Sequence, residues 1–430
     1  MGHIIHNFDA LAVSDQRKNA LLIAEAGYDA IDVGKALAHK LRIDNGELRV
    51  EERPYQLSGR RIFFVGIGKC AFVAAAAIEK LLGDMLTAGI ALGVSSSEEF
   101  GLKKVEALAG THPLPSEQNE NATRKIFEML SKLSKDDLVI FLVSGGGSTL
   151  ICSYEAPMTY ADEAALFKDL TAHGATIQEM NTVRKHTSRA RGGGLARAAY
   201  PAEVVSLIVS DVPGNDIAFI SSAPTVKDSS TIEDAEAVLA KYGVTPAAGV
   251  TFIESPKDEK FFGRVTNILF LTGRDALMAM MDAAAEQGYL AEIADDHFAG
   301  EARDIARKVI GKLRATAPKT ALLYAGESTV TLGATRGAGG RSQEMALAAL
   351  GAVSPDELIL PFSSDGRDNT DAAGAIGDNI SRMHATAYNL SPEEYLDAHR
   401  SYDFFSATGD ALMTGYTGSN VSDLIIALKN

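Results

Sequence analysis

Short apolar runs, each closed by glycine or a small polar residue, alternate with amphipathic segments along most of the chain. Uninterrupted apolar runs of this length are typical of strands that are buried on both faces of a parallel sheet. The runs occupy residues 61–66, 138–143, 204–209, 268–271, 321–324 and 358–362. This alternation predicts an α/β fold in which glycine-rich loops follow the strands.

Apolar residues at helical spacing predict the helices between these strands. A long helix is expected over residues 16–41, interrupted or bent near Gly27. Another is expected over 231–242, because Thr231 and Asp234 have the spacing of a capping box and Gly243 suits a left-handed C-terminal position. The remaining predicted helices lie at 71–82, 275–287 and 341–350.

The stretch from 244 to 260 carries two prolines and a cluster of charges, and we take it as the candidate domain boundary. The sequence then predicts two α/β lobes. The N-terminal lobe, residues 1–245, is expected to be Rossmann-like with a mostly parallel sheet, and the second lobe spans 260–430. Because ligands bind at the carboxyl ends of parallel strands, the glycine-rich loops mark the expected sites.

Charge and cysteine content exclude several classes of protein. The 430 residues contain 41 Lys and Arg against 56 Asp and Glu, a net charge of −15, which argues against a nucleic-acid or anionic-membrane surface. Cys70 and Cys152 lack the spacing of a zinc site or a disulfide framework, and no apolar run approaches the ~20 residues of a membrane span. A cytoplasmic protein is the simplest expectation, and any anionic ligand must meet a local basic patch.

The first predicted strand is followed by a glycine turn, Gly66-x-Gly68-x-x-Ala71, that fits a dinucleotide-binding fingerprint. Asp84 lies in a segment that resembles a helix end, not at the tip of the next strand, where a ribose-binding acid belongs. Cys70 stands where a Walker A motif needs Ser or Thr. Three alternatives remain: a dinucleotide fold, a plain tight turn, or a phosphate contact through Lys69.

Two further segments suggest an anionic ligand. A glycine loop follows the strand at 138–143 and can act as a phosphate cradle, although a flexible loop is the alternative; its residues are Ser144, Gly145, Gly146, Gly147 and Ser148. The segment 181–197 is basic, and its nucleotide-binding candidates are Asn181, Arg184 and Lys185. A basic helix face exposed to solvent is the alternative there.

Carboxylates and one arginine complete the candidate site. Asp211 and Asp216 follow the strand at 204–209, where they suit Mg²⁺ or simply stabilise a turn. Arg341 opens a predicted helix, which is electrostatically unfavourable unless an anion shares the position, and Asp365 lies in an acidic loop at 363–371. Glycine cradles, basic residues and carboxylates together are typical of phosphoryl transfer.

As a set these motifs resemble the glycerate 2-kinase family, whose members carry a C-terminal MOFRL domain. The resemblance extends from about residue 7 to 428 and is carried by residues 144–150, 181–186, 192–194, 210–214, 223–225, 339–344, 371–374 and 414–423. It implies transfer of the ATP γ-phosphoryl group to the 2-hydroxyl of D-glycerate, with Mg²⁺, in a cleft between two α/β domains. It also implies that Lys69 and Arg341 are active-site residues.

The roles within such a site are hypotheses. The glycine loop and Lys69 would hold phosphates, Arg341 would neutralise the transferred group or fix the glycerate carboxylate, and Asp211 or Asp365 would bind Mg²⁺ or accept the hydroxyl proton. Asp216 is the second metal candidate.

The chain departs from the family pattern at Ala223 and Arg367. Arg367 adds a cation beside the expected substrate loop, so a larger or more anionic sugar acid than glycerate is an alternative substrate. An NAD(P)H-dependent hydroxypyruvate reductase and a non-catalytic sugar-phosphate sensor are the rival functions. The oligomeric state is left open, a homodimer included.

Overall fold

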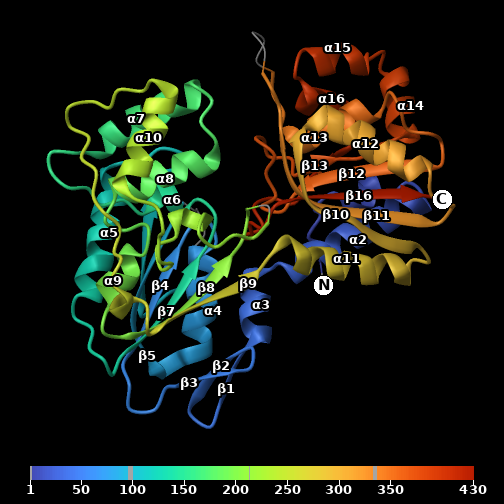
Figure 1. Ribbon diagram of the computed structural model, residues 1–430. Coiled ribbons are helices and arrows are strands. Elements are labelled where there is room, and N and C mark those ends of the chain that lie inside the picture. Colours follow the sequence, from blue (N-terminus) through green and yellow to red (C-terminus); the bar gives the residue numbers. More distant parts are fainter. Residues whose placement is uncertain (1, 95–99, 213, 333–336) are drawn as a thin grey trace. The chain divides into compact units, whose positions relative to one another are not determined.

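The computed structural model describes residues 2–94, 100–212, 214–332 and 337–430 (Figure 1). The chain forms two compact units. One, here called the central unit, comprises Val33–Ser210 and Asn215–Phe270; the other, the terminal unit, comprises Met1–Asp32, Asp211–Gly214 and Leu271–Asn430. Each unit has its own sheet, as the alternation of apolar runs and helices predicted.

The central unit is built on a six-stranded sheet with the order β6-β5-β4-β7-β8-β9. Neighbouring strands from β6 to β8 are parallel. Every residue of the two middle strands, β4 and β7, is buried, which explains their unbroken apolar runs. The strands are β4 Ile62–Ile67, β5 Leu86–Val94, β6 Val105–Gly110, β7 Leu138–Val143, β8 Glu203–Val209 and β9 Val265–Leu271.

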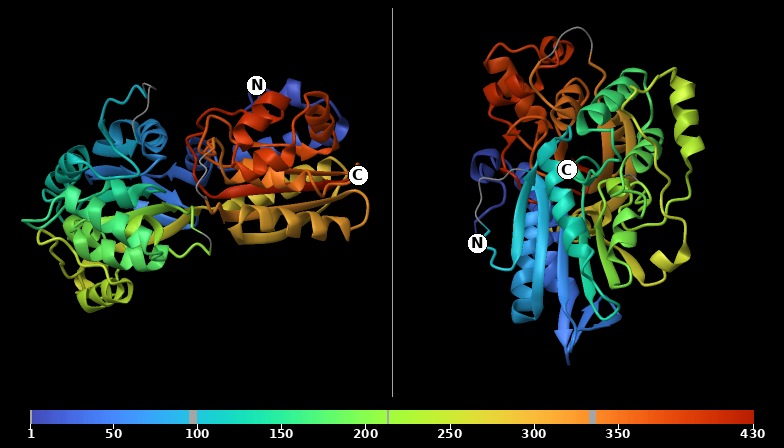
Figure 2. Two further views of the ribbon diagram at one scale, coloured as in Figure 1. Left: turned by 90° about the horizontal axis from the view of Figure 1, so that it is seen from above. Right: turned by 90° about the vertical axis from the view of Figure 1, so that its left-hand side faces the viewer.

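Helices cover this sheet, and the right-hand view of Figure 2 shows α5 lying along it. A small antiparallel sheet of β1 Leu41–Asp44, β2 Glu47–Val50 and β3 Arg53–Gln56 belongs to the same unit. The helices are α3 Val33–Lys40, α4 Ala71–Leu82, α5 Glu117–Leu130, α6 Gly147–Leu150, α7 Tyr160–Ala172, α8 Ile177–Thr187, α9 Gly194–Ala199 and α10 Ile232–Tyr242.

The terminal unit has a mixed sheet with the order β10-β11-β16-β12-β13-β15, and β14 pairs with β12. β10 and β11 are parallel, whereas β16, the last strand of the chain, lies antiparallel between β11 and β12. The strands are β10 Leu290–Glu301, β11 Thr320–Thr329, β12 Glu357–Ser363, β13 Gly374–Ala375, β14 Gly377–Asp378, β15 Ala411–Leu412 and β16 Asp423–Lys429.

Helices pack on both faces of the mixed sheet, with α2 and α11 on one face and α12 and α13 on the other (Figure 1). The helices of the terminal unit are α1 Phe8–Leu11, α2 Asp15–Ala30, α11 Gly273–Glu286, α12 Ala302–Arg314, α13 Arg341–Ala349, α14 Asn379–Ala387, α15 Pro392–Asp397 and α16 Ser401–Thr408. No helix among the described residues is both long and apolar enough to span a membrane.

The predicted interruption near Gly27 is wrong. Helix α2 continues through Gly27 to Ala30, and the break falls at Ile31 and Asp32, before α3. A Cβ atom on Gly27 would lie 2.8 Å from Sδ of Met280 on α11, so this glycine permits close helix packing and does not mark a bend. The predicted helix at 231–242 is confirmed: Thr231 and Asp234 form the capping box, and Gly243 is left-handed.

The compact units divide the chain differently from the predicted boundary at 244–260. That stretch is tied into the central unit, where the Ile253 amide donates to the carbonyl oxygen of His186 at 2.8 Å. The first 32 residues pack with the terminal unit instead, because the buried Arg17 on α2 pairs with Asp378 and Asp410 at 2.7 and 2.8 Å.

Candidate functional site

Two glycine loops meet at the carboxyl ends of β4 and β7 in the central unit. These strands are parallel neighbours, so the turn at 66–71 lies beside the loop at 144–148. The amide of Lys69 donates to the carbonyl oxygen of Gly145 at 2.9 Å, and the amide of Cys70 donates to Ser144 Oγ at 3.1 Å. A Cβ atom on Gly68 would lie 2.3 Å from the carbonyl oxygen of Ser144, so the close approach requires glycine there.

A third segment, residues 221–223, is hydrogen-bonded to the glycine loop. Ser221 Oγ donates to the carbonyl oxygen of Ser144 at 2.6 Å, and Ser222 Oγ donates to Asn181 Oδ1 at 2.7 Å. Ser221, Ser222 and Ala223 have φ angles of 51°, 56° and 56°, a left-handed conformation that is costly for residues other than glycine. Strain of this kind persists where surrounding contacts enforce it, and it concentrates at functional sites.

Basic side chains gather around this glycine loop. A Cβ atom on Gly146 would lie 3.4 Å from Cδ2 of His112 and 3.5 Å from Cγ of Lys69. Partial desolvation, together with the charges of Lys69 and Arg184, lowers the pKa of His112. Burial and the charge of Arg191 lower the pKa of Arg184 to about 10. Lys69 and Arg184 therefore act with positive charge on the His112 ring, which lies beside the loop where an anion would be favoured.

His112 has no sequence motif that marks it as a site residue. It follows β6, at the same carboxyl edge of the sheet as Lys69 and the glycine loop. Several side chains of β6 are exposed or half-buried, so the strand lacks the apolar run that marked β4 and β7. The parallel pairing of β6 with β5 brings His112 to this edge, and the sequence of β6 does not reveal that pairing.

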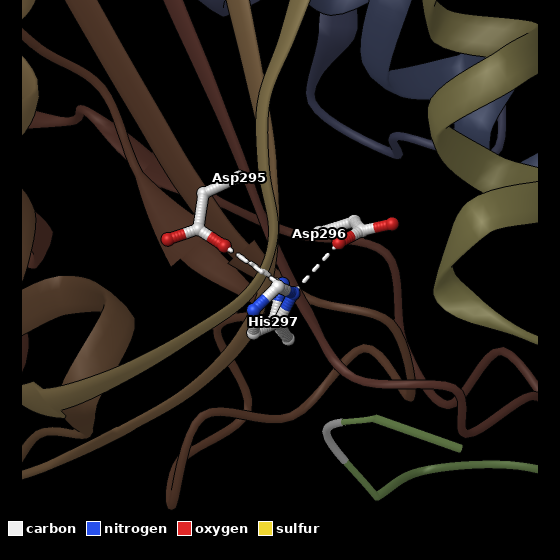
Figure 3. A group of neighbouring side chains, drawn as sticks. All are labelled: Asp295, Asp296 and His297. Carbon is white, nitrogen blue, oxygen red and sulfur yellow. Dashed lines mark hydrogen bonds and ion pairs between the residues drawn. The ribbon is translucent and has the colours of Figure 1, made fainter.

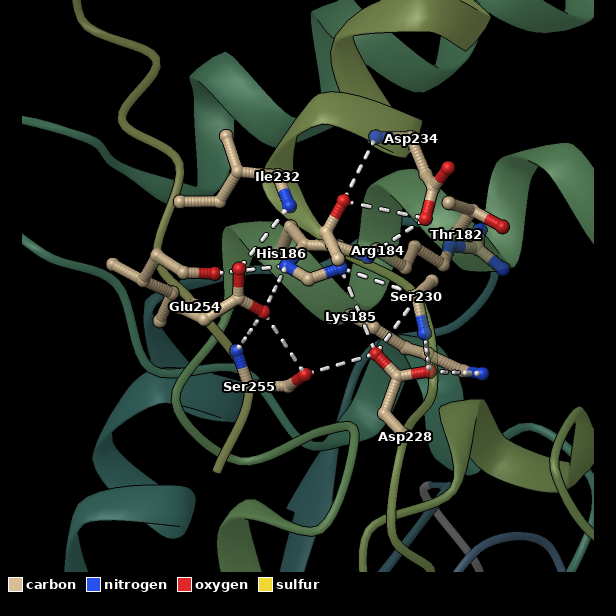
Figure 4. Close-up of polar contacts among 12 residues, drawn as sticks. Thr182, Arg184, Lys185, His186, Asp228, Ser230, Ile232, Asp234, Glu254 and Ser255 are labelled. Atoms are coloured by element: carbon tan, nitrogen blue, oxygen red, sulfur yellow. Dashed lines mark hydrogen bonds and ion pairs between the residues drawn. The ribbon is translucent and has the colours of Figure 1, made fainter. Parts of the chain in front are cut away.

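Much of the basic segment 181–197 is buried and paired within the protein, so a basic helix face exposed to solvent does not describe it. Lys185 Nζ lies 3.1 Å from Asp228 Oδ1, and both side chains are buried. Figure 4 shows this pair beside His186, whose ring nitrogens contact the carbonyl oxygen of Ile253 at 3.0 Å and Ser230 Oγ at 3.2 Å. The structure thus places Lys185 in a buried polar network.

Arg191 belongs to a second buried pair. Its guanidinium donates two hydrogen bonds to Glu163, at 2.5 and 3.1 Å, and a third to the carbonyl oxygen of Arg184 at 3.2 Å. The glycines that follow permit tight packing, because a Cβ atom on Gly194 would lie 1.8 Å from the carbonyl oxygen of Arg189. Among the predicted nucleotide-binding residues of this segment, Arg184 acts through its charge on His112. Asn181 accepts a hydrogen bond from Ser222 Oγ, which also lies 2.9 Å from Ser148 Oγ of the glycine loop.

In the terminal unit, Arg341 lies at the start of α13 among carboxylates of the chain itself. Its Nε atom forms an ion pair with Asp423 Oδ2 at 2.7 Å, and Nη1 contacts Glu327. Asp368 accepts hydrogen bonds from the amides of Ser342 and Gln343 at 3.1 and 2.8 Å. The anion expected near this helix start is therefore supplied by the protein.

These carboxyl groups have unusual proton affinities. Burial raises the pKa of Asp423 to about 7, with Arg341 opposing the shift and Asp368 reinforcing it. Burial also raises the pKa of Asp368 to about 6, although hydrogen bonds from the start of α13 favour the charged form. The pKa of the buried Tyr28 is raised by burial and by neighbouring carboxylates. Perturbed groups of this kind often mark functional sites.

The other predicted carboxylates lie in turns. Asp365 is buried, and its Oδ1 accepts hydrogen bonds from Ser363 Oγ and the amide of Arg367, both at 3.0 Å. Asp211 accepts a hydrogen bond from Asn420 Nδ2 at 2.8 Å within the terminal unit. Asp216 is exposed, belongs to the central unit and accepts a hydrogen bond from the amide of Ala218 at 2.9 Å.

Two features lie outside the predicted site. Asp295, Asp296 and His297 on β10 have ligand atoms within 4.8 Å of one another (Figure 3), and the pKa of His297 is raised chiefly by its hydrogen bond to Asp296. That pairing, at 2.7 Å, is sufficient to explain the group. A cavity of about 770 Å³ between α5 and α9 is lined by Glu120, Tyr154, Arg197 and their neighbours, and no predicted site residue lines it.

Comparisons with known proteins identify both parts of the chain. Residues 19–253 match a family described as a domain of unknown function, DUF4147, and residues 320–423 match the MOFRL family. A provisionally named hydroxypyruvate reductase of Agrobacterium vitis is 39% identical, over 87% of this chain and 88% of that protein. The D-glycerate 2-kinase of Thermotoga maritima is 35% identical, over 88% of this chain and 93% of that protein.

A solved structure is similar over nearly the whole length. The crystal structure of a glycerate kinase from Thermotoga maritima has a TM-score of 0.83 and 31% identity, covering 96% of this chain and 99% of that chain. The resemblance that the sequence motifs indicated is thereby confirmed, and the chain belongs to the glycerate kinase family with a MOFRL domain.

Proposed function

We propose that this protein transfers the γ-phosphoryl group of ATP to the 2-hydroxyl of D-glycerate and forms 2-phospho-D-glycerate. The observation that carries the proposal is the convergence of Lys69 and His112 on the glycine loop at the carboxyl ends of β4 and β7, with the charge of Arg184 acting on His112. The similarity to a D-glycerate 2-kinase and to a glycerate kinase structure of Thermotoga maritima supports the choice of glycerate as substrate.

Phosphate binding follows from the chemistry of that loop. Gly145, Gly146 and Gly147 have no Cβ atom, and Gly146 has a left-handed backbone conformation. Backbone amides of the loop can therefore approach an oxyanion closely. Lys69 and Arg184 supply positive charge. Because its pKa is lowered, His112 is neutral at pH 7 and donates or accepts a hydrogen bond without adding charge.

The acceptor hydroxyl needs a base and the substrate needs an anchor. A carboxylate within hydrogen-bond reach of the 2-hydroxyl would accept its proton as the new O–P bond forms, and Asp211 and Asp365 are the two candidates. We propose that Arg341 binds an oxyanion of the substrate, either the glycerate carboxylate or the transferred phosphoryl group. A guanidinium suits either, because it binds such groups with two parallel hydrogen bonds.

Mg²⁺ is the metal expected in this reaction, and it takes oxygen ligands from carboxylates together with substrate phosphates. Asp211 and Asp216 offer such oxygens; Asp211 accepts a hydrogen bond from Asn420, and Asp216 accepts one from the amide of Ala218. When bound, the ion would neutralise charge on the transferred group.

One experiment separates the candidate functions. The purified full chain is given ATP, Mg²⁺ and D-glycerate, ADP formation is followed, and ³¹P NMR identifies the phosphorylated position. Release of ADP that depends on D-glycerate, with phosphate on the 2-hydroxyl, is expected. ATP hydrolysis that is indifferent to glycerate, or phosphate at another position, contradicts the proposal. A panel of other hydroxy acids tests whether Arg367 favours a larger or more anionic substrate.

A hydroxypyruvate reductase is the second candidate, because the Agrobacterium relative carries that name. Its nicotinamide cofactor would use the fingerprint at Gly66, yet Asp84 is exposed and precedes β5, whereas a ribose-binding acid belongs at the end of that strand. Oxidation of NADH by hydroxypyruvate, without ADP formation, would favour the reductase. Neither activity, with a thermal shift on adding 2-phosphoglycerate, would favour a sensor.

A further inference from the structure

Arg341 has two carboxylate partners that differ in exposure. Asp423 is 4% exposed, whereas Glu327 is 46% exposed, and the guanidinium between them is 33% exposed. Nε faces Asp423 at 2.7 Å and Nη1 faces Glu327. One partner is thus enclosed in the protein and the other is open to solvent.

The enclosed partner is fixed by the sheet. Asp423 is the first residue of β16, which lies between two neighbours, and it pairs with Gly326 of β11 on one side and Ser363 of β12 on the other. The two strands hold the backbone of Asp423, and its carboxylate is enclosed by the protein, so the carboxylate has little room to move. Asp423 therefore keeps the guanidinium in one orientation.

Glu327, the partner that is open to solvent, can be replaced by another anion. Glu327 lies on β11, and its long side chain contacts the guanidinium from the solvent side. Exposed ion pairs are weak, because water competes for both charges and the side chains lose conformational freedom. An incoming oxyanion can therefore replace this carboxylate at Nη1 at little cost.

The charges around Arg341 favour such an exchange. Glu327, Asp368 and Asp423 all lie close enough to contribute to the electrostatic environment of the one guanidinium. An anion that arrived while Glu327 stayed in place would meet a surplus of negative charge. Exchange of one oxyanion for another leaves the local charge balance unchanged, whereas a neutral ligand has no means of displacing the carboxylate.

We propose that Glu327 is a specificity-determining residue that occupies the substrate's oxyanion position on Arg341 until an anionic substrate displaces it, while Asp423 acts as the positioning residue. This inference rests on the proposed function, since it assigns Arg341 to an oxyanion of the substrate. The oxyanion is a carboxylate or a phosphate, and kinetics distinguish the two sources.

Steady-state kinetics of the full chain test the inference. The Glu327→Gln variant loses the competing charge, so its KM for the substrate bound at Arg341 should fall by about two- to fivefold, the range set by an exposed ion pair. A fall in the KM for D-glycerate identifies the carboxylate, and a fall in the KM for ATP identifies the phosphate. Glu327→Asp retains the charge and should restore a KM close to that of the wild type.

The matched control is Glu292→Gln, which removes another exposed carboxylate of the same unit, one that pairs with Lys312 at 2.6 Å. Its KM values should equal those of the wild type. Asp423→Asn should instead lower kcat, because the guanidinium loses its fixed partner. A raised or unchanged KM in Glu327→Gln overturns the inference, because a merely structural glutamate would give one of those results.

A binding measurement separates this inference from the proposed function. Calorimetric titration with D-glycerate and, separately, inorganic phosphate needs no turnover. If the wild type forms no ADP but Glu327→Gln binds either anion more tightly than the wild type, the inference stands and the kinase assignment fails. If neither anion binds more tightly to the variant, or neither binds at all, the inference fails even where the kinase is active.

Discussion

The amide nitrogen of Lys69 lies 2.9 Å from the carbonyl oxygen of Gly145, so the turn after β4 and the loop after β7 are joined by a backbone hydrogen bond. The contact places a lysine side chain next to a chain of glycines at the carboxyl edge of a parallel sheet. Ligands bind at this edge in open α/β folds.

Replacement of Lys69 by alanine should lower kcat/KM on the order of 10²-fold, because the side chain would stabilise charge that develops on the transferred phosphoryl group. Lys168→Ala removes an exposed lysine of the same unit and should leave turnover unchanged. ADP formation measured for both variants checks the expectation. Near wild-type turnover in Lys69→Ala would remove this lysine from the site.

Replacement of glycine by alanine should destabilise the protein more at position 68 than at position 59. Both have positive φ angles, 109° and 74°, so alanine is strained at either, by about 1–2 kcal/mol. A Cβ atom on Gly68 meets the carbonyl oxygen of Ser144 at 2.3 Å, whereas one on Gly59 has nothing within 4 Å. Gly68→Ala should therefore lower the urea midpoint of unfolding clearly more than Gly59→Ala does. Equal shifts would mean that the loops do not pack as described.

Features that depend on neighbours in the chain could be predicted from the sequence. The capping box of α10 involves residues three apart, Thr231 and Asp234, and the stop at Gly243 needs only a left-handed residue. The glycine loop after β7 was found for a similar reason, since an apolar run followed by three glycines is a local pattern.

Features that depend on distant partners could not be predicted in this way. The insertion of β16 between β11 and β12 is a matter of strand pairing, and it brings Asp423 to Arg341 from 82 residues away. The partners of Lys185 and Arg191, Asp228 and Glu163, are likewise distant in sequence, so a buried pair and an exposed basic face could not be told apart.

The N-terminal segment should be essential to the terminal unit. Arg17 on α2 is 1% exposed and pairs with Asp378 and Asp410, and removal of one member of a buried ion pair typically costs about 3–5 kcal/mol. Arg17→Met should therefore lower the urea midpoint strongly. Arg307→Met, which removes a 69% exposed arginine of the same unit, is the control and should change stability by at most about 0.5 kcal/mol. Similar midpoints for the two variants would contradict the assignment of α2 to this unit.

The carboxyl group of Asp423 should make the stability of the terminal unit depend on pH. Its pKa in the folded state is about 7, mainly because of burial, against about 3.9 for an unfolded chain, so the folded state binds the extra proton between these values. Stability contributed by this group is fully present below about pH 4 and is lost as the pH rises toward 7, by at most about 1.4 kcal/mol per pH unit. Arg341 opposes this loss, while Asp368 and Glu327 increase it.

Asp423→Asn removes the titration and is the test of this dependence. The urea midpoints of the wild type and the variant are compared at intervals from pH 4 to pH 8. Because the wild type loses this contribution as the pH rises and asparagine does not titrate, the midpoint of the wild type should fall relative to that of the variant between pH 4 and 7, then run parallel to it. Parallel curves across the whole range would show that Asp423 ionises at its ordinary pKa. A relative rise of the wild type with pH would show that Arg341 outweighs burial and lowers the pKa instead.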